Sequence, residues 1–472
     1  MKMKGFLWVR AGLAAICLCG VLLSGCGLVA PKQETTEKTD AAGPGSDPTQ
    51  TTAMTETKTE ELTDCPPIRA QGMAYLYGET ETDAVSYRVG DPIRFRIRLT
   101  DSADFGRTYR CAKLSWHAEA DDGQTWSGTD SAGTGRLTLT FSMNAPGSIR
   151  VTAEACDRDG VKLDNVQPFV GGAICGLEQI RTGVECPADF DAFWQAQLAE
   201  LDSVPHEALY VDPADSPDPN FQAYSVGIRS HRAEKPVTGY LTVPKNAKAG
   251  NLKIRMFFYG YNASFIPSPQ CADGYVTFTV NAHSMENGRE KAYYTGLQNG
   301  ELKEYGFAAA DYDDPSNSYF RDMILRDVQA LRYLKTLREW NGRDIQLYGG
   351  SMGGFQATAV AALESGVTDL SVFIVWMCDV SGRSVGRLSG WLPEYTENLN
   401  YFDSVHFAER VTCPTTISQA GLIDYTATPT GVAAYYNALR VKKSITFVQS
   451  ADHGLSPIRR VTYSRSQERK GD

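Results

Sequence analysis

From about residue 183 onward, the chain alternates short apolar runs with longer segments whose apolar residues recur at helical spacing. Apolar runs such as 254–259 and 445–448 indicate strands buried on both faces. Alternating strands and amphipathic helices form βαβ units, in which helices cover both faces of a mostly parallel sheet. We therefore expect residues 181–456 to form an α/β domain with a doubly wound sheet. The other predicted strands are 275–280, 345–348, 370–376 and 415–418, and the predicted helices are 190–201, 320–337, 353–364 and 430–439.

Residues 65–180 show a different pattern, with short alternating strands and no helical period. Turn signals separate these strands, for example Val89-Gly90-Asp91-Pro92 and Asp121-Asp122-Gly123. The pattern predicts a small antiparallel β-sandwich of immunoglobulin-like type, although the Cys-Trp-Cys spacing of antibody domains is absent. No recognisable catalytic set lies in it. We interpret it as a packing module, with carbohydrate contact or a role as a spacer as the alternatives.

A Gly-rich turn follows the predicted strand 345–348 and precedes an Ala-rich helix. It reads Gly349-Gly350-Ser351-Met352-Gly353, which is a G-x-S-x-G motif in a strand–turn–helix context. A turn this sharp strains the serine backbone, and side chains at 349 and 353 would collide with neighbouring backbone. The turn exposes the Ser351 hydroxyl and directs the Met352 N–H and the helix N-terminus towards a reacting carbonyl oxygen. We expect Ser351 to be a nucleophile.

A serine hydroxyl needs a base, and the base needs an orienting acid. On a turn of this kind the acid and then the base follow the serine along the chain. Only His406 and His453 follow Ser351. We favour His453, because it comes directly after the predicted strand 445–449, whereas His406 lies in a polar stretch and is interpreted as a surface or packing histidine.

The acid is expected at the end of another strand, where a loop can carry a carboxylate to the imidazole. Asp424 follows the predicted strand that begins at Thr415, and we favour it. Asp379 follows the predicted strand 370–376 and is the rival, with helix capping as its other interpretation.

Aromatic residues gather at two places beside this expected site. Phe257-Phe258-Tyr259-Gly260-Tyr261 follows an early strand, where the Tyr261 N–H is expected to be the second oxyanion donor. Core packing or a sugar-stacking platform that includes Tyr259 are the other interpretations of this cluster. Trp391 lies between the Ser351 turn and Asp424, and we expect it to stack on a sugar ring, whereas Trp376 is expected in the core.

Taken together, these segments resemble the acetylxylan esterase and cephalosporin C deacetylase family of carbohydrate esterases, within the α/β-hydrolase superfamily. The resemblance covers about residues 185–455. It implies a Ser351–His453–Asp424 triad, an oxyanion hole formed by the N–H groups of Tyr261 and Met352, and removal of acetyl groups from xylan or xylo-oligosaccharides without a cofactor. The segments that carry it are Pro187–Trp194, the helix Arg326–Trp340, Gly349–Gly354, Gly421-Leu422-Ile423-Asp424 and Asp452-His453.

The sequence departs from the family pattern at several positions. Met352 stands where the family usually has Gln, which changes only a side chain, since the N–H is the expected donor. Asn281-Ala282-His283 replaces the family's Arg-Gly-Gln, and Tyr259-Gly260 replaces its His-Gly. Gly454 follows His453 where the family has Glu. These departures concern the substrate range and oligomeric arrangement more than the chemistry.

Two other functional classes remain open at this stage. A serine peptidase of the prolyl-oligopeptidase kind shares the serine turn and the residue order, but its β-propeller needs more chain than residues 65–180 provide. A catalytically inactive glycan-binding lipoprotein is the other alternative, and the presence of Ser351, Asp424 and His453 argues against it.

The first residues predict export. Lys2, Lys4 and Arg10 precede an apolar stretch, Ala11–Leu23, which is too short for a membrane span and typical of a signal peptide. Leu23-Ser24-Gly25-Cys26 resembles a bacterial lipobox, which implies cleavage of residues 1–25, lipidation of Cys26 and a cell-surface protein held on the membrane by acyl chains. Residues 26–64 are rich in Thr, Glu and Lys and predict a flexible tether.

The remaining features limit the partners. The chain of 472 residues has 46 Lys and Arg against 56 Asp and Glu, a net charge of −10, which argues against nucleic acid as a partner. No C-x-x-C motif or His cluster indicates a metal site. Eight cysteines would remain free to pair after processing, and the sequence selects no pairing among them. The basic stretch within residues 457–472 is expected to be a disordered end.

Overall fold

The computed structural model describes residues 59–60, 73–264, 268–281, 283–454, 457 and 459–468. The predicted signal peptide, Cys26 and nearly all of the predicted tether 26–64 lie outside these residues. These described residues all belong to one compact unit. The predicted division of this unit near residue 180 therefore stays a prediction.

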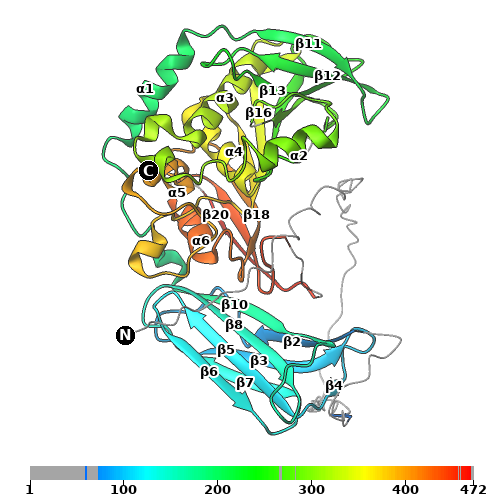
Figure 1. Ribbon diagram of the computed structural model, residues 1–472, viewed down its shortest axis with the longest axis vertical. Coiled ribbons are helices and arrows are strands. Elements are labelled where there is room, and N and C mark those ends of the chain that lie inside the picture. The colour runs from blue at the N-terminus through cyan, green and yellow to red at the C-terminus, as the bar shows by residue number, and fades with distance from the viewer. Residues whose placement is uncertain are drawn as a thin grey trace, which may run out of the picture. The chain divides into compact units, whose positions relative to one another are not determined.

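The first part of this unit contains two four-stranded sheets (Figure 1). Apolar residues alternate with polar ones along their strands, as in Arg136–Phe141, so one face of each sheet is buried. Phe95 of one sheet lies 6.4 Å from Phe169 of the other, ring centre to ring centre, so the buried faces pack together. Two sheets of this kind were predicted, whereas the immunoglobulin-like type stays a prediction. In spatial order, the strands are β7 (Arg136–Phe141), β3 (Ile93–Asp101), β2 (Ala74–Thr80) and β9 (Val166–Gln167) in one sheet, and β10 (Phe169–Cys175), β8 (Gly147–Cys156), β5 (Lys113–Ala120) and β6 (Thr125–Asp130) in the other, with β1 (Thr59–Glu60) and β4 (Thr108–Tyr109) as a separate pair.

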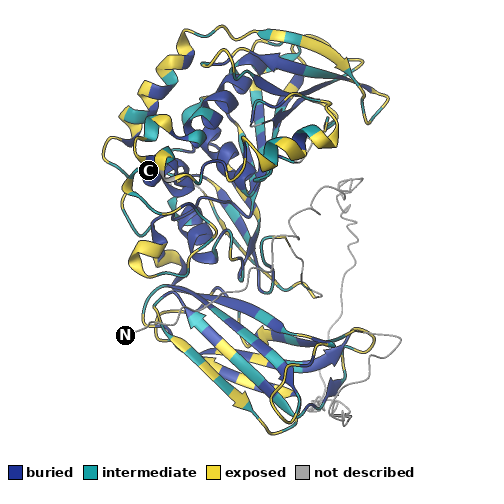
Figure 2. Cartoon of the chain, viewed as in Figure 1, coloured by how far each residue is buried: buried dark blue, intermediate teal, exposed yellow. Residues whose placement is uncertain are grey.

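A ten-stranded sheet forms the core of the second part, with a parallel centre and antiparallel edges. Along one central strand every residue from Val276 to Asn281 is buried, and along its parallel neighbour Leu252–Phe258 every second residue is buried (Figure 2). This confirms the predicted α/β class, while the doubly wound arrangement stays a prediction. In spatial order the strands are β11 (Ala208–Ala214), β12 (Phe221–Ile228), β13 (Val237–Pro244), β15 (Tyr275–Asn281), β14 (Leu252–Phe258), β16 (Trp340–Gly350), β17 (Asp369–Phe373), β18 (Thr415–Gly421), β19 (Lys443–Val448) and β20 (Thr462–Gln467).

Helices α3, α4, α5 and α6 pack side by side along this sheet (Figure 1). Helix α3 contacts β12 and β13, helix α4 contacts β14, β16 and β17, and helix α6 contacts β18 and β19, so these helices together extend along most of the sheet. The α-helices are α1 (Phe190–Asp202), α2 (Lys291–Asn299), α3 (Tyr319–Leu334), α4 (Met352–Leu363), α5 (Ser404–Ala408) and α6 (Pro429–Ala438), and the short 3-10 helices are η1 (Leu177–Gln179), η2 (Ala309–Tyr312), η3 (Pro315–Asn317), η4 (Gly382–Val385) and η5 (Glu397–Phe402).

One expectation about the chain end is wrong. The basic stretch that begins at Arg459 was expected to be disordered, but Thr462–Gln467 forms strand β20, which pairs antiparallel with β19. Its side chains are alternately half-buried and exposed, as at a sheet edge with one covered face. Its Tyr463 hydroxyl donates to Gln449 Oε1 at 3.0 Å. Because nearly all residues of this strand are polar, its sequence lacks the alternation of apolar and polar residues that predicts a strand.

Candidate active site

Ser351 lies between the end of β16 and the start of α4, with φ 56° and ψ −124°. A positive φ is costly for a residue with a side chain and persists only where the surroundings enforce it. Here the Ser351 N–H donates to the Phe373 carbonyl at 3.1 Å, and the Trp376 N–H donates to the Ser351 carbonyl at 3.2 Å. These bonds to the segment after β17 hold the serine in the strained conformation.

The glycines of the motif are required by close backbone approach. A β-carbon on Gly349 would lie 2.1 Å from the Gly353 carbonyl oxygen. A β-carbon on Gly353 would lie 2.2 Å from the Phe258 carbonyl oxygen. Neither contact can be relieved by moving a side chain, because both involve backbone atoms. The turn therefore folds only with glycine at these positions.

Three of the predicted site residues are in contact. His453 Nε2 lies 2.7 Å from Ser351 Oγ, and His453 Nδ1 lies 2.8 Å from Asp424 Oδ2. Ser351 follows β16, Asp424 follows β18 and His453 follows β19. Because these strands are parallel, their carboxyl ends lie at one edge of the sheet and bring the side chains together.

Asp424 is buried, and its second oxygen is held by its own turn. Oδ1 accepts the N–H groups of Thr426 at 2.7 Å and Ala427 at 2.9 Å. Oδ2 is therefore left facing the imidazole, and the side chain cannot rotate without losing both bonds. A fixed carboxylate at Nδ1 favours the tautomer in which Nε2 accepts a proton from the serine.

The two rival residues lie elsewhere. The Asp379 carboxylate accepts the Gly183 N–H at 2.7 Å and forms an ion pair with Arg387. His406 is buried in α5 against Phe190, and burial lowers its pKa to about 4, with Arg410 as a smaller cause. Asp379 thus ties two chain segments together, and His406 is a packing residue.

The two predicted oxyanion donors approach the serine from different elements. Tyr261 follows β14, which pairs with β16 up to Phe258 and Gly349. A β-carbon on Gly260 would lie 3.7 Å from Ser351 Cβ, so this loop passes beside the serine. In the described part of the chain, neither the Tyr261 N–H nor the Met352 N–H has a hydrogen-bond acceptor.

Gln356 joins the two donor segments and was missed in the sequence. Its Nε2 donates to the Tyr259 carbonyl at 3.2 Å and to the Met352 carbonyl at 3.4 Å. The side chain is buried in helix α4, in which Thr358 is the one other polar residue. A polar residue in such a helix was the available signal, because buried amides require partners.

Aromatic rings surround the Tyr261 side chain. Tyr305 stacks on it at 4.0 Å between ring centres, and Trp391 meets it edge-on at 4.8 Å. Trp376 is fully buried as predicted, and its Nε1 donates to the Trp391 carbonyl at 2.6 Å. Trp391 is 41% exposed, so one face of this cluster is open to solvent. Tyr259, the other predicted sugar contact, is half-buried, and burial raises its pKa.

Tyr305 and the neighbouring His283 are buried away from water. His283 Nδ1 lies 2.6 Å from the Tyr319 hydroxyl, and burial lowers the pKa of His283 to about 3. The Tyr305 hydroxyl lies 3.4 Å from Met352 Sδ, and burial raises its pKa. These groups are uncharged at neutral pH. Polar contacts in such surroundings are stronger than they are in water.

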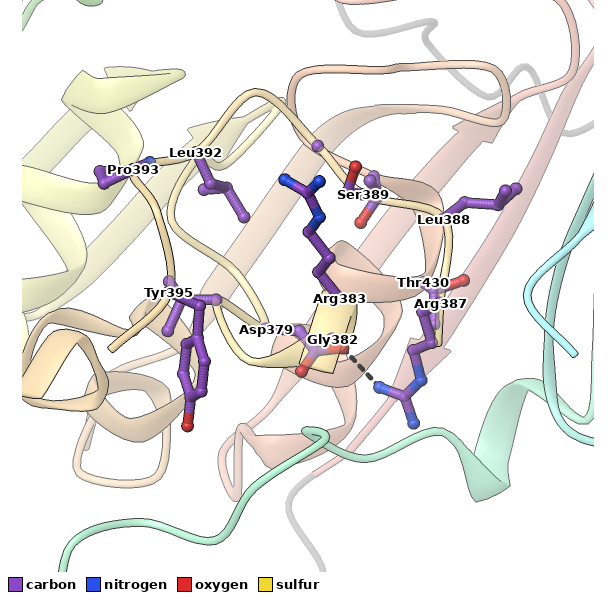
Figure 3. Close-up of a pocket in the computed structure, with 13 residues that line it drawn as sticks. Asp379, Gly382, Arg383, Arg387, Leu388, Ser389, Leu392, Pro393, Tyr395 and Thr430 are labelled. Atoms are coloured by element: carbon purple, nitrogen blue, oxygen red, sulfur yellow. Dashed lines mark hydrogen bonds and ion pairs between the residues drawn. The ribbon is translucent and has the colours of Figure 1, made fainter. Parts of the chain in front are cut away.

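A small hollow of about 30 Å³ lies on the segment that joins Asp379 to Tyr395 (Figure 3). In Figure 3 the Asp379 carboxylate points towards Arg387, whereas Arg383 points away from this ion pair. Thr428 and Thr430, at the start of α6, complete the wall. The segment between Asp379 and Tyr395 therefore carries a small polar hollow, and the two neighbours of Trp391, Gly390 and Leu392, are part of its lining.

The described residues show no metal cluster of three or more His, Cys, Asp or Glu side chains. The seven cysteines among them, Cys111, Cys156, Cys175, Cys186, Cys271, Cys378 and Cys413, are free thiols, and Cys65 lies outside the described ranges. Within those ranges, no helix combines the length and the apolar character that crossing a membrane requires.

A serine on a sharp strand-to-helix turn, with an Asp and a His following it at later strand ends, is the arrangement of the α/β-hydrolase class. The model of the acetyl xylan esterase (AXE1) family matches residues 174–385 and 393–463, which is more than half of the chain. The chain belongs to the acetyl xylan esterase family.

The individual relatives share about a quarter or less of their aligned residues with this chain. The chain is 26% identical over 291 residues to acetyl esterase Axe7A of Xylanibacter ruminicola, a match that covers 58% of this chain and 65% of that protein. The acetyl xylan esterase of Paenibacillus sp. R4 is 22% identical with a TM-score of 0.49, over 60% of this chain and 94% of the other. Acetyl xylan esterase 1 of Thermoanaerobacterium sp. JW/SL YS485 is 20% identical with a TM-score of 0.48, over 60% and 93%.

Proposed function

We propose that the protein is a serine esterase that removes O-acetyl groups from xylan, xylo-oligosaccharides or related acetylated carbohydrates. The observation that carries this proposal is the contact of His453 with both Ser351 and Asp424 at the turn between β16 and α4. Membership of the acetyl xylan esterase family supports the ester as the bond attacked. The name of the relative Axe7A, an acetyl esterase, supports acetate as the acid released.

The reaction follows from the roles of these groups. His453 Nε2 takes the hydroxyl proton as Ser351 Oγ attacks the acetyl carbonyl, while Asp424 orients the imidazole. The N–H groups of Tyr261 and Met352 stabilise the oxyanion. The protonated imidazole gives its proton to the departing sugar oxygen. Water, activated by the same imidazole, then attacks the acetyl-enzyme and releases acetate.

The sugar is proposed to lie against the open aromatic face. Trp391 presents an exposed ring next to Tyr261, whose N–H is a proposed oxyanion donor. A sugar ring stacked on Trp391 would place an acetyl group near the serine, and Tyr259 in the same loop is a second candidate contact.

The test is a direct comparison of substrates. Purified protein is incubated with acetylated xylan and, separately, with a chromogenic dipeptide, and the release of acetate and of amine is measured. We expect acetate only. Release of amine would favour a peptidase of the prolyl-oligopeptidase kind, and release of neither product would favour an inactive glycan-binding protein.

We also propose that the protein works outside the cell, held on the membrane by lipid on Cys26. The lipobox-like Leu23-Ser24-Gly25-Cys26 after an apolar run supports this, and residues 26–64 would be the tether. The chain is expressed in a bacterium fed with labelled palmitate. Label should enter the wild type and be absent from Cys26→Ser, and an unlabelled wild type would contradict the proposal.

A further inference from the structure

Strand β10 of the sandwich borders the two turns that carry Asp424 and His453. The Gly172 N–H donates to the Gln449 carbonyl at 3.1 Å. A β-carbon on Gly172 would lie 2.1 Å from the Leu422 carbonyl oxygen. Both partners immediately precede these turns in the sequence. The sandwich thus approaches the acid and the base at the points where their turns leave the sheet.

Asp121, in the turn between β5 and β6, makes a second connection. Its Oδ1 accepts the Leu388 N–H at 2.9 Å. Its Oδ2 accepts the Thr430 hydroxyl and, within the sandwich, the Ser148 N–H at 2.6 Å and the Ser148 hydroxyl at 2.9 Å. Asp121 is only 7% exposed. The partners of its carboxylate are uncharged donors of Ser148, Leu388 and Thr430, so donated hydrogen bonds compensate this buried carboxylate.

The partners of Asp121 outside the sandwich adjoin the proposed site. Leu388 belongs to the segment that lines the hollow next to Trp391. Thr430 is the second residue of α6, which begins directly after the turn in which Thr426 and Ala427 hold Asp424. One carboxylate therefore holds both the segment around Leu388 and the start of the helix that follows the Asp424 turn.

We propose that Asp121 is a positioning residue of the esterase site, through which the sandwich holds the Asp424 turn and the segment 386–390 in place. The expected effect of Asp121 on catalysis rests on the proposed esterase function. The sandwich is then part of the machinery of the site as well as a packing module.

Asp101 offers a matched control. It too is a buried aspartate of the sandwich, 7% exposed, and it accepts the N–H groups of Ala103 and Asp104 and the Tyr109 hydroxyl. All of these partners lie within the sandwich. Asp101→Ala should therefore damage the sandwich to a similar degree without touching the site.

Amide hydrogen exchange measured on the full chain tests the positioning role. In Asp121→Ala, exchange should be faster by about tenfold or more in peptides covering 386–390 and 424–432, because local opening becomes easier. In Asp101→Ala those peptides should exchange as in the wild type. Equal exchange in the two variants would overturn the proposal.

Asp121→Asn gives a sharper result. Three donors meet Oδ2 and one meets Oδ1, so the amide oxygen should face Ser148 and Thr430, and the NH₂ group should face the Leu388 N–H. Exchange should then rise in 386–390 and stay unchanged in 424–432. A rise in both segments, or in neither, contradicts the assigned contacts.

Kinetics supply the link to catalysis. With p-nitrophenyl acetate, Asp121→Ala and Thr430→Val should each lower kcat about tenfold below Asp101→Ala. Asp121→Ala already removes the bond from the Thr430 hydroxyl, so adding Thr430→Val should slow the double variant no further than the slower single variant. Equal kcat in Asp121→Ala and Asp101→Ala would overturn the positioning role. If the wild type releases no p-nitrophenol, the proposed function fails, whereas the exchange comparison still decides whether Asp121 holds these segments.

Discussion

The Gly353 α-carbon lies so close to the Phe258 carbonyl that an added β-carbon would be 2.2 Å from its oxygen. Phe258 ends the strand that leads to Tyr261, and Gly353 is the second residue of the helix that follows Ser351. This contact therefore brings together the two elements whose N–H groups are the proposed oxyanion donors. Glycine at 353 is required by the geometry of the site as well as by the turn.

Gly353→Ala tests this relationship. The new methyl group would meet backbone, so the turn must shift, at a cost of about 1–3 kcal/mol or more in the free energy of unfolding. We expect a lower Tm and a loss of about 10²-fold or more in kcat on p-nitrophenyl acetate, because the donors separate. Gly296→Ala in α2 is the control, since nothing lies within 4 Å of its added β-carbon. An active, stable Gly353→Ala variant would contradict the geometry.

Ser351→Ala removes the proposed nucleophile. It should abolish acetate release from p-nitrophenyl acetate and from acetylated xylan, because no acetyl-enzyme can form. The strain at φ 56° remains, so the Tm should change little. Acetate assays and thermal unfolding are run on the same preparation. Activity near that of the wild type would refute the assignment of the nucleophile.

Asp424→Asn should lower kcat by about 10³–10⁴-fold while the protein stays folded. The amide oxygen would keep the bonds from Thr426 and Ala427, which places the NH₂ group against His453 Nδ1. That nitrogen would then have to accept, which puts the proton on Nε2 and leaves no base for the serine. Asp379→Asn is the comparison: if it proved the slower variant, the acid would be misassigned.

The sequence predicted the parallel strands and their helices well, because buried apolar runs and amphipathic segments differ in period. The helices 320–337 and 353–364 are found at Tyr319–Leu334 and Met352–Leu363. Strand β20 was not predicted, because an edge strand needs few apolar residues and this one has only Tyr463. The contacts among Ser351, Asp424 and His453 could be predicted because each residue follows a strand. The ends of parallel strands meet at one edge of the sheet. Asp121 could not be singled out, since only the packing of distant segments gives a turn aspartate its partners.

Trp391→Ala tests the proposed sugar contact. The ring is 41% exposed and stacks on Trp376, so its loss should weaken sugar binding without opening the core. Loss of about 1 kcal/mol of stacking would raise KM for acetylated xylo-oligosaccharides about fivefold. Catalysis with p-nitrophenyl acetate, which has no sugar, should change much less. Val211→Ala, an exposed apolar residue of β11, is the control, and equal losses on both substrates would argue against a sugar contact.

His406 should make the folded protein less stable in acid. Its folded pKa is about 4, lowered by burial and then by Arg410 from an ordinary value of 6.5. Between these values the unfolded chain binds a proton that the folded chain does not, so the free energy of unfolding falls as the pH drops. From pH 7 to pH 5 this residue accounts for a loss of about 2 kcal/mol.

His406→Phe should remove that part of the pH dependence. Neither ring nitrogen has a hydrogen-bond partner among the described residues, so phenylalanine sacrifices no bond. The free energy of unfolding, measured with urea at pH 7 and pH 5, should therefore differ by about 2 kcal/mol less in the variant than in the wild type. Phe407→Leu, which changes packing in the same helix without a titrating group, should lower both values equally. If His406→Phe behaved like Phe407→Leu, the imidazole would not be the group whose protonation destabilises the fold.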